Sequence, residues 1–236
     1  MVKVLSTRPT STDPDVLEPP VTRTGTVRRF GWSCAVATAL SALVFTWLVS
    51  DESLNLFRSL PFSNFYDVQA RALLAGHWNM PAATLWIEGF RIGGKTYMYY
   101  GPFPALLRIP VLLITHRLDG RLTEISLLIA FIVALVAVSR ISWKVRLLIR
   151  GRAPVGWAEA IAAGALTAAI GLGSVMLFLG SNIEVYYEAE LWGAALALCA
   201  FDAIVGFVMR PTWWKIALAG GLAPRGTGST GSPVST

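Results

Sequence analysis

The residues best suited to chemistry lie in one polar, aromatic and glycine-rich stretch, residues 65–104, of an otherwise mostly apolar chain. Catalytic and binding residues lie more often on loops than on the helices and strands that support the loops, so we expect the functional site in this stretch. Asp67 lies at the expected start of a short helix that Gly76 would end, so it is either a helix cap or a catalytic acid. Asp51 directly follows an apolar run, where it is either catalytic or simply faces water.

Other charged side chains could contribute to the same site. Lys95 lies among tyrosines, where it either binds a phosphate or extends its amine from the membrane surface into water. Arg108 lies on a short apolar segment, from which it can reach lipid headgroups or a lipid phosphate. Three acids crowd one short turn, where they either join the site and bind a divalent metal ion, or are solvated. These acids are Glu184, Glu188 and Glu190.

The composition indicates which elements must position these residues. The chain is 54% hydrophobic and 14% charged, whereas a soluble domain carries about 25% charged residues. Lipid is therefore the expected solvent for much of the surface. The net charge of +6 arises from positive residues beside apolar runs, which is typical of membrane proteins and argues against nucleic-acid binding. Cys34 and Cys199 fall inside apolar runs and are expected to be packed core residues.

Four apolar runs predict an all-α, polytopic transmembrane helix bundle. Residues 1–29 are rich in proline and threonine and are expected to be disordered in the cytoplasm. The pair Arg28-Arg29 and the basic segment 140–152 are both expected in the cytoplasm, so the long loop between them is extracytoplasmic. The expected spans are residues 31–49, 124–139, 157–180 and 191–209, followed over residues 216–236 by a truncated span and a flexible tail.

Two features of these runs leave alternatives open. Residues 103–115 are apolar but short, and Arg108 and Pro110 interrupt them, so we expect a helix in the outer membrane interface, with a further span as the alternative. Asp202 lies inside the fourth expected span. A buried acid there indicates either a functional site or a partner that the chain lacks.

Three motifs together suggest a family. The first is Asp67-x-x-x-Arg71-Ala-Leu-Leu-x-Gly76-x-Trp78, the second is Gly94-Lys-x-Tyr-x-Tyr-x-Gly-Pro-x-Pro104, and the third is Tyr186-Tyr-Glu-Ala-Glu-Leu-Trp-Gly193. Their order resembles the N-terminal half of the GT-C superfamily of integral-membrane glycosyltransferases, over about residues 30–215. Protein O-mannosyltransferases and the lipid A aminoarabinose transferase are members. Because members have more spans, the resemblance implies a truncated enzyme.

The resemblance implies sugar transfer at the outer membrane face, from a polyprenyl-phosphate donor to an acceptor hydroxyl. An acid of the first outer loop would take the acceptor proton as a general base, with Asp67 as the first candidate and Asp51 as the second. Positive side chains would bind the donor phosphate. The candidates are Lys95, Arg71, Arg91 and Arg108. The chain departs from the lipid A enzyme at Ser63-Asn64, where that enzyme has its leading acid, and at Tyr100-Gly101, where it has a Glu-Lys pair.

A non-catalytic function fits the same sequence. A membrane scaffold or lipid-binding subunit would keep the spans and the polar loop without turnover. A transporter is less well supported, because neither paired repeats nor helices broken at the membrane midplane are evident in the sequence.

Overall fold

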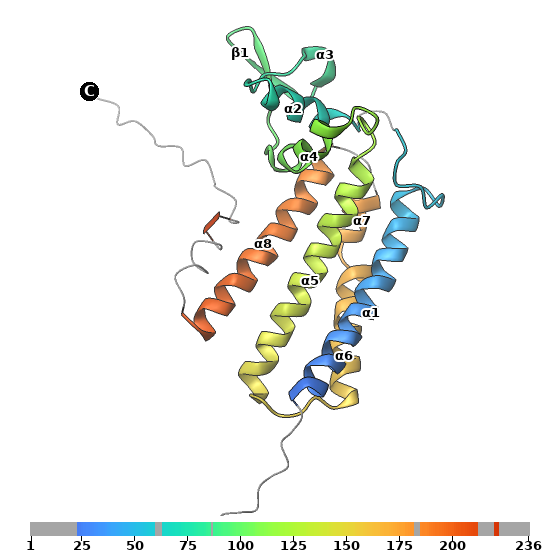
Figure 1. Cartoon of the computed structure of the whole chain (residues 1–236), viewed down its shortest axis with the longest axis vertical. Helices are drawn as coiled ribbons and strands as arrows, with labels where there is room; N and C mark the ends of the chain where they lie inside the picture. The colour runs from blue at the N-terminus through green and yellow to red at the C-terminus, as the bar shows by residue number, and fades with distance from the viewer. Residues whose placement is uncertain (1–22, 60–62, 86, 182–184, 212–219, 222–236) are drawn as a thin grey trace, which may run out of the picture.

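The computed structural model describes residues 23–59, 63–85, 87–181, 185–211 and 220–221. They form a helical bundle with a smaller lobe at one end (Figure 1). The bundle contains α1 (Arg23–Val49), α5 (Thr123–Arg150), α6 (Trp157–Gly173), α7 (Val175–Ser181) and α8 (Val185–Met209). The lobe contains α2 (Phe65–Leu74), α3 (Ala82–Leu85), α4 (Phe103–Ile114) and the strands β1 (Gly89–Ile92) and β2 (Lys95–Met98).

Three helices of the described chain are long and apolar enough to cross a membrane, and they contain three of the four expected spans. They are Val27–Val49, Thr123–Arg150 and Tyr186–Met209. In the bundle, α1 packs against α6 and α5, and α5 packs against α8 (Figure 1). Residues 23–29, which we expected to be disordered, form the first turns of α1, where Arg29 lies 5.1 Å from the ring centre of Trp157. The rest of the expected N-terminal segment, and nearly all of residues 216–236, lie outside the described residues.

The expected third span, residues 157–180, is divided between two helices. Ser174 has an extended backbone (φ −107°, ψ 168°) and ends α6 after 17 residues. The Met176 N–H then donates to the Ser174 hydroxyl at 3.2 Å, so Ser174 acts as a cap at the start of α7. Serine competes for backbone hydrogen bonds in this way, which is why the apolar run is interrupted here.

Glycines allow close helix packing in the bundle, as the small residues of this run predict. A Cβ atom built on Gly164 would lie 2.4 Å from the Ser33 hydroxyl oxygen of α1. One built on Gly180 would lie 1.8 Å from the ring of Phe45, which is 1% exposed and stacks on Phe131 with ring centres 4.3 Å apart. The ring therefore has little room to move away.

This packing makes a testable prediction for Gly180. Substitution of Gly180 by alanine should lower the unfolding free energy by roughly 1–3 kcal/mol, because the new methyl group overlaps the fixed Phe45 ring. Gly173→Ala is the matched control, since a Cβ atom there meets nothing within 4 Å. Thermal unfolding of the two variants in detergent measures the difference. Equal melting temperatures would contradict the packing described here.

A short β-hairpin, which the expected all-α fold class did not include, projects from the lobe (Figure 1). Its strands are antiparallel, with Ile92 opposite Lys95. Gly93 and Gly94, which connect them, have φ values of 56° and 79°. A two-residue hairpin turn requires these left-handed conformations, and glycine adopts them without strain. The sequence indicated a turn here, but strands of four residues were too short to recognise from periodicity.

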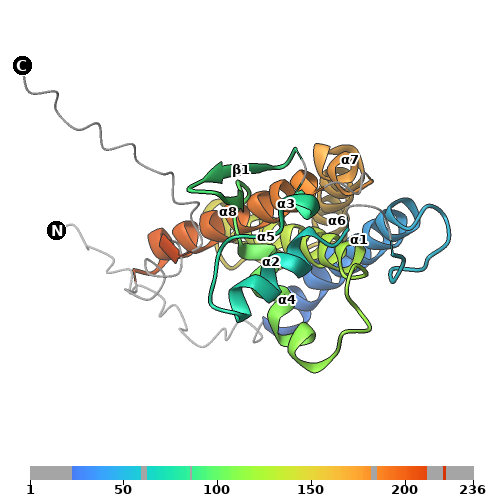
Figure 2. The same ribbon diagram turned by 90° about the horizontal axis from the view of Figure 1, so that it is seen from above.

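The lobe is attached to the bundle through α4, which contacts both α2 and α8 and lies across the bundle's end (Figure 2). Gly76 ends α2 as predicted, because at φ 78° it lets the His77 N–H donate to the Ala72 carbonyl at 3.0 Å. The lobe has its own apolar core. That core includes Phe65, Tyr66, Ala70, Met80, Leu85, Ala105 and Leu112.

At the end of the bundle away from the lobe, ion pairs connect α5 to its neighbours. Arg140 and Lys144 approach the Asp202 carboxylate of α8 at 3.1 and 2.6 Å. Arg146 approaches Glu159 of α6 at 3.0 Å. Asp202 therefore has its partners within this chain, and the structure gives it a role in holding α8 against α5.

Candidate functional site

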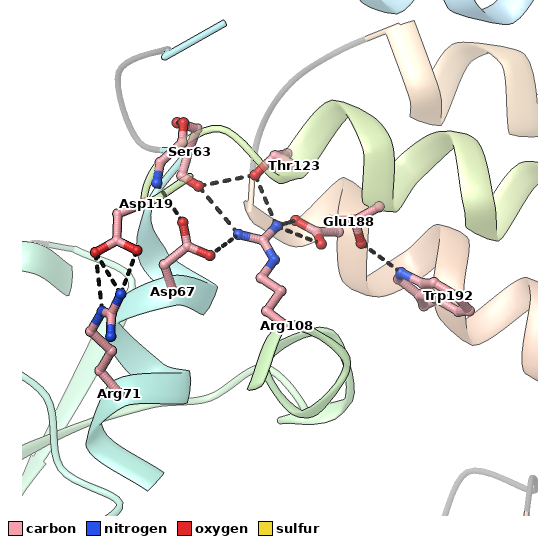
Figure 3. Close-up of polar contacts among 10 residues, drawn as sticks. Ser63, Asp67, Arg71, Arg108, Asp119, Thr123, Glu188 and Trp192 are labelled. Carbon is pink, nitrogen blue, oxygen red and sulfur yellow. Dashed lines mark hydrogen bonds and ion pairs between the residues drawn. The ribbon is translucent and has the colours of Figure 1, made fainter. Parts of the chain in front are cut away.

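A buried ionic cluster lies where the lobe meets the bundle (Figure 3). Arg108 Nη1 donates to Asp67 Oδ1 at 2.8 Å, and Arg108 Nη2 donates to the two Glu188 oxygens at 2.7 and 2.6 Å. The side chains of Asp67, Arg108 and Glu188 are at most 3% exposed. They come from α2, α4 and the first turn of α8, so the cluster joins three segments that are distant in the sequence.

Asp67 occupies the first turn of α2, where a negative charge interacts favourably with the helix dipole. It is not the cap residue, because Asn64 holds that position. Its second oxygen, Oδ2, accepts a hydrogen bond from the Gly120 N–H at 2.5 Å. Both carboxylate oxygens therefore have partners, and each partner comes from a different segment of the chain.

Thr123, the first residue of α5, gives the cluster a second contact with the bundle, beside that of Glu188 on α8. Its hydroxyl accepts a hydrogen bond from Arg108 Nη2 at 2.9 Å and donates one to the Ser63 carbonyl at 3.0 Å (Figure 3). Arg108 is thereby held by a carboxylate on each side and a hydroxyl between them. Among the described residues, its Nε atom has no hydrogen-bond partner.

The electrostatics of the cluster keep Arg108 charged. Burial lowers the pKa of Arg108, but the negative charges of Glu188 and Asp67 outweigh burial and raise this pKa overall. The guanidinium also lies 5.5 Å from the ring centre of Tyr66. Burial, followed by the charge of Glu188, raises the pKa of Tyr66, which therefore stays neutral at physiological pH. The cluster combines one guanidinium with two carboxyl groups, and its stability depends on all three hydrogen-bonded groups remaining in place.

The second candidate base, Asp51, has a different environment. It follows α1 in a left-handed conformation (φ 51°), and the adjacent Glu52 N–H donates to the Trp47 carbonyl at 2.8 Å, which closes the end of the helix. Its side chain is 89% exposed and lies 3.7 Å from Arg58. Among the described residues, no hydrogen bond or ion pair connects Asp51 to the buried cluster.

The four expected phosphate-binding side chains do not converge. Arg108 joins the cluster, whereas Arg71 binds Asp119 through two nitrogens at 2.6–3.1 Å. Arg91 and Lys95 are exposed on the hairpin. Lys95 lines a separate cleft in the lobe.

Of the three acids expected in the second outer turn, Glu188 joins the cluster and Glu190 is exposed on α8. Glu184 lies outside the described residues. Within the described ranges, no group of three His, Cys, Asp or Glu side chains is placed to hold a metal ion, so the divalent metal has no donor set there.

Sequence reasoning missed several groups that complete the cluster. The sequence marks Ser63 only as a departure from the lipid A enzyme, and it indicates no role for Thr123. Gly120 was also missed, although the Asp119-Gly120 pair is a turn signal and Gly120 has a φ of 73°. That turn brings the Gly120 N–H to Asp67 and the Asp119 carboxylate to Arg71.

Comparisons with protein-family models, with curated proteins and with solved structures gave no match, so no family is assigned by similarity.

Proposed function

We propose that the protein is an integral-membrane glycosyltransferase that moves a sugar from a polyprenyl-phosphate donor to an acceptor at the outer face of the cell membrane. The observation that supports this most is the meeting of Asp67 and Glu188 on Arg108. These acids come from the two outer segments marked by the resemblance, and they meet at one end of an apolar bundle. A donor with a long hydrocarbon chain stays in lipid, so its reactive phosphosugar has to be met at such an end.

The distribution of charge supports this orientation. The end of α5 away from the lobe is strongly basic, which supports a cytoplasmic location for that end and for the N-terminus, with the lobe outside. The basic residues of this end of α5 and of the turn that follows it are Arg140, Lys144, Arg146, Arg150 and Arg152. The chain then crosses the membrane several times, and the divided α6–α7 segment forms a further crossing beside the three long helices.

In this arrangement α4 lies in the outer interface of the membrane. It has 12 residues, which is too short for a span. It buries Arg108 and Leu112 but leaves Leu113 and Ile114 67% and 86% exposed. Exposed apolar side chains on one side and a buried cation on the other fit a helix that lies in the plane of the lipid surface.

The reaction uses Asp67 as the general base. As the acceptor oxygen forms a bond to the anomeric carbon of the sugar, its proton passes to the Asp67 carboxylate. The bond between that carbon and the phosphate oxygen breaks, and polyprenyl phosphate leaves with the electron pair. Because both Asp67 oxygens have partners in the structure, transfer requires one partner, Arg108 or the Gly120 N–H, to be exchanged for the acceptor hydroxyl.

A transfer assay tests this proposal directly. The full chain is reconstituted in lipid vesicles with radiolabelled polyprenyl-phosphate sugars and a panel of hydroxyl-bearing acceptors. We expect time-dependent formation of a labelled product that depends on both donor and protein. A folded preparation that gives no product with any donor of the panel, and yet binds the donor, would contradict catalysis and favour the alternative below.

The alternative is a non-catalytic membrane scaffold or lipid-binding subunit. The observation in its favour is that Arg108, Asp67 and Glu188 are bound to one another, so the cluster already satisfies its own charges. Such a cluster can serve to hold the lobe on the bundle without any turnover.

A further inference from the structure

The lobe contains a cleft of about 560 Å³ between the C-terminal end of α2 and the β-hairpin. None of the three charged cluster residues is among the residues that line it, so it is a separate feature of the lobe. Its lining is aromatic and polar rather than aliphatic. The residues that matter here are Gln69, Trp78, Phe90, Lys95, Tyr97 and Tyr100.

Gln69, one of the lining residues, has an unsatisfied hydrogen-bond acceptor beneath the surface of the cleft. Its side chain is buried, with the residue 3% exposed, and its Oε1 atom has no hydrogen-bond partner among the described residues. A buried amide oxygen without a partner is unfavourable by about 1–3 kcal/mol, so such groups are usually satisfied in the functional state. A ligand hydroxyl in the cleft would supply the missing donor once the Gln69 amide turned toward it.

The aromatic side chains give the cleft apolar ring faces beside these polar groups. Trp78 is 60% exposed and Phe90 is 43% exposed, and Phe90 stacks on Tyr97 with ring centres 5.8 Å apart. The negative face of an aromatic ring attracts weakly positive C–H groups, and the flat face of a pyranose presents several of them. A ligand that combines C–H faces with hydroxyl groups matches both parts of the lining.

The Tyr100 hydroxyl and the Lys95 amine add two further polar groups to the cleft. Tyr100 donates a hydrogen bond to Glu88 at 2.9 Å, and its hydroxyl lies 2.7 Å from that of Tyr99. Burial, together with these hydrogen bonds, raises the pKa of Tyr100, so it remains a neutral hydroxyl. Lys95 supplies a positive charge, and none of the described lining residues is Asp or Glu. The lining therefore suits hydroxyl-bearing ligands and does not suit a hydrocarbon chain.

We propose that this cleft binds a pyranose unit of a saccharide, which stacks on Trp78 and Phe90 and donates a hydroxyl to Gln69. The assignment of this saccharide as the acceptor of the transfer rests on the proposed function, because the lipid-linked donor stays at the membrane. Binding itself needs only the cleft.

Saturation-transfer NMR on the purified full chain in detergent tests the cleft. The probes are mannotriose, maltotriose and chitotriose, with pentaalanine as a peptide probe. We expect saturable binding of at least one trisaccharide, weakened roughly tenfold by Trp78→Ala and at least threefold by Lys95→Met. Arg117→Met is the matched control, because Arg117 is an exposed lobe cation that is not among the cleft-lining residues.

The outcomes separate this inference from the proposed function. Absence of saturable trisaccharide binding overturns the inference. So does a loss of trisaccharide affinity that is equal in the Lys95→Met and Arg117→Met variants. Binding of pentaalanine in place of the sugars overturns it in favour of a peptide groove. Saccharide binding without any transfer supports the cleft and rejects the enzyme, whereas transfer without trisaccharide binding rejects the cleft alone. Unchanged melting temperatures of the Trp78 and Lys95 variants show that their losses are local.

Discussion

Substitution of Arg108 by methionine is expected to lower the unfolding free energy by about 3–5 kcal/mol, because it leaves two buried carboxylates without their cation. Asp67 and Glu188 are each within 2.8 Å of the guanidinium, and both are almost completely buried. The lobe should detach from the bundle first, since Arg108 connects α2 to α8 through these contacts. Thermal unfolding in detergent, followed by tryptophan fluorescence, measures the loss.

Three further variants separate the charge of Arg108 from its bulk. Arg108→Lys keeps the positive charge, but its single amine cannot contact both carboxylates as the guanidinium does. Its unfolding free energy should therefore lie between those of the unmodified chain and Arg108→Met. Arg108→Met combined with Asp67→Asn and Glu188→Gln removes every charge and should regain most of the stability. Arg71→Met removes the partly exposed pair with Asp119 and should lower the unfolding free energy by at most about 1 kcal/mol. If Arg108→Met lowers the unfolding free energy no more than Arg71→Met does, the cluster does not hold the lobe in place.

Composition was sufficient to predict the bundle but not its interruptions. Long apolar runs need only length and hydropathy to be recognised, and α1, α5 and α8 lie where such runs occur. The break at Ser174 depends on one hydroxyl that caps α7, and the run around it is apolar on both sides. The hairpin escaped prediction because each strand has four residues, too few for an alternating pattern to stand out.

The sequence was sufficient to name the charged residues of the site, but not to predict which of them contact one another. Arg108 stood out because a charge on an apolar segment needs a partner, yet the partner depends on how α2, α4 and α8 pack. For the acids of the expected second outer turn, helix geometry decides which one is buried. Positions two apart lie about 200° apart around an α-helix, so when Glu188 faces inward, Glu190 faces outward. The sequence did not show where α8 begins, and therefore could not show which acid would be buried.

If Asp67 is the base, the Asp67→Asn variant should transfer sugar roughly 10²–10⁴ times more slowly than the unmodified chain, while remaining folded. Asparagine has nearly the same shape as aspartate and can still accept a hydrogen bond from Arg108, but it cannot take a proton from the acceptor. Arg108 keeps its pair with Glu188 in this variant, so the loss of stability should stay near that of one charged hydrogen bond, about 1.5–3 kcal/mol. The assay is the vesicle transfer reaction, with rates expressed per folded molecule.

Glu188→Gln is the control that separates proton transfer from the structural role of the cluster. Glu188 contacts the same guanidinium as Asp67 and is equally buried, so its substitution removes a comparable charge from Arg108. In our proposal it takes no proton, and the variant should retain much more activity than Asp67→Asn at a similar melting temperature. If the two variants lose activity equally, Asp67 acts only by positioning Arg108, and another group has to receive the acceptor proton.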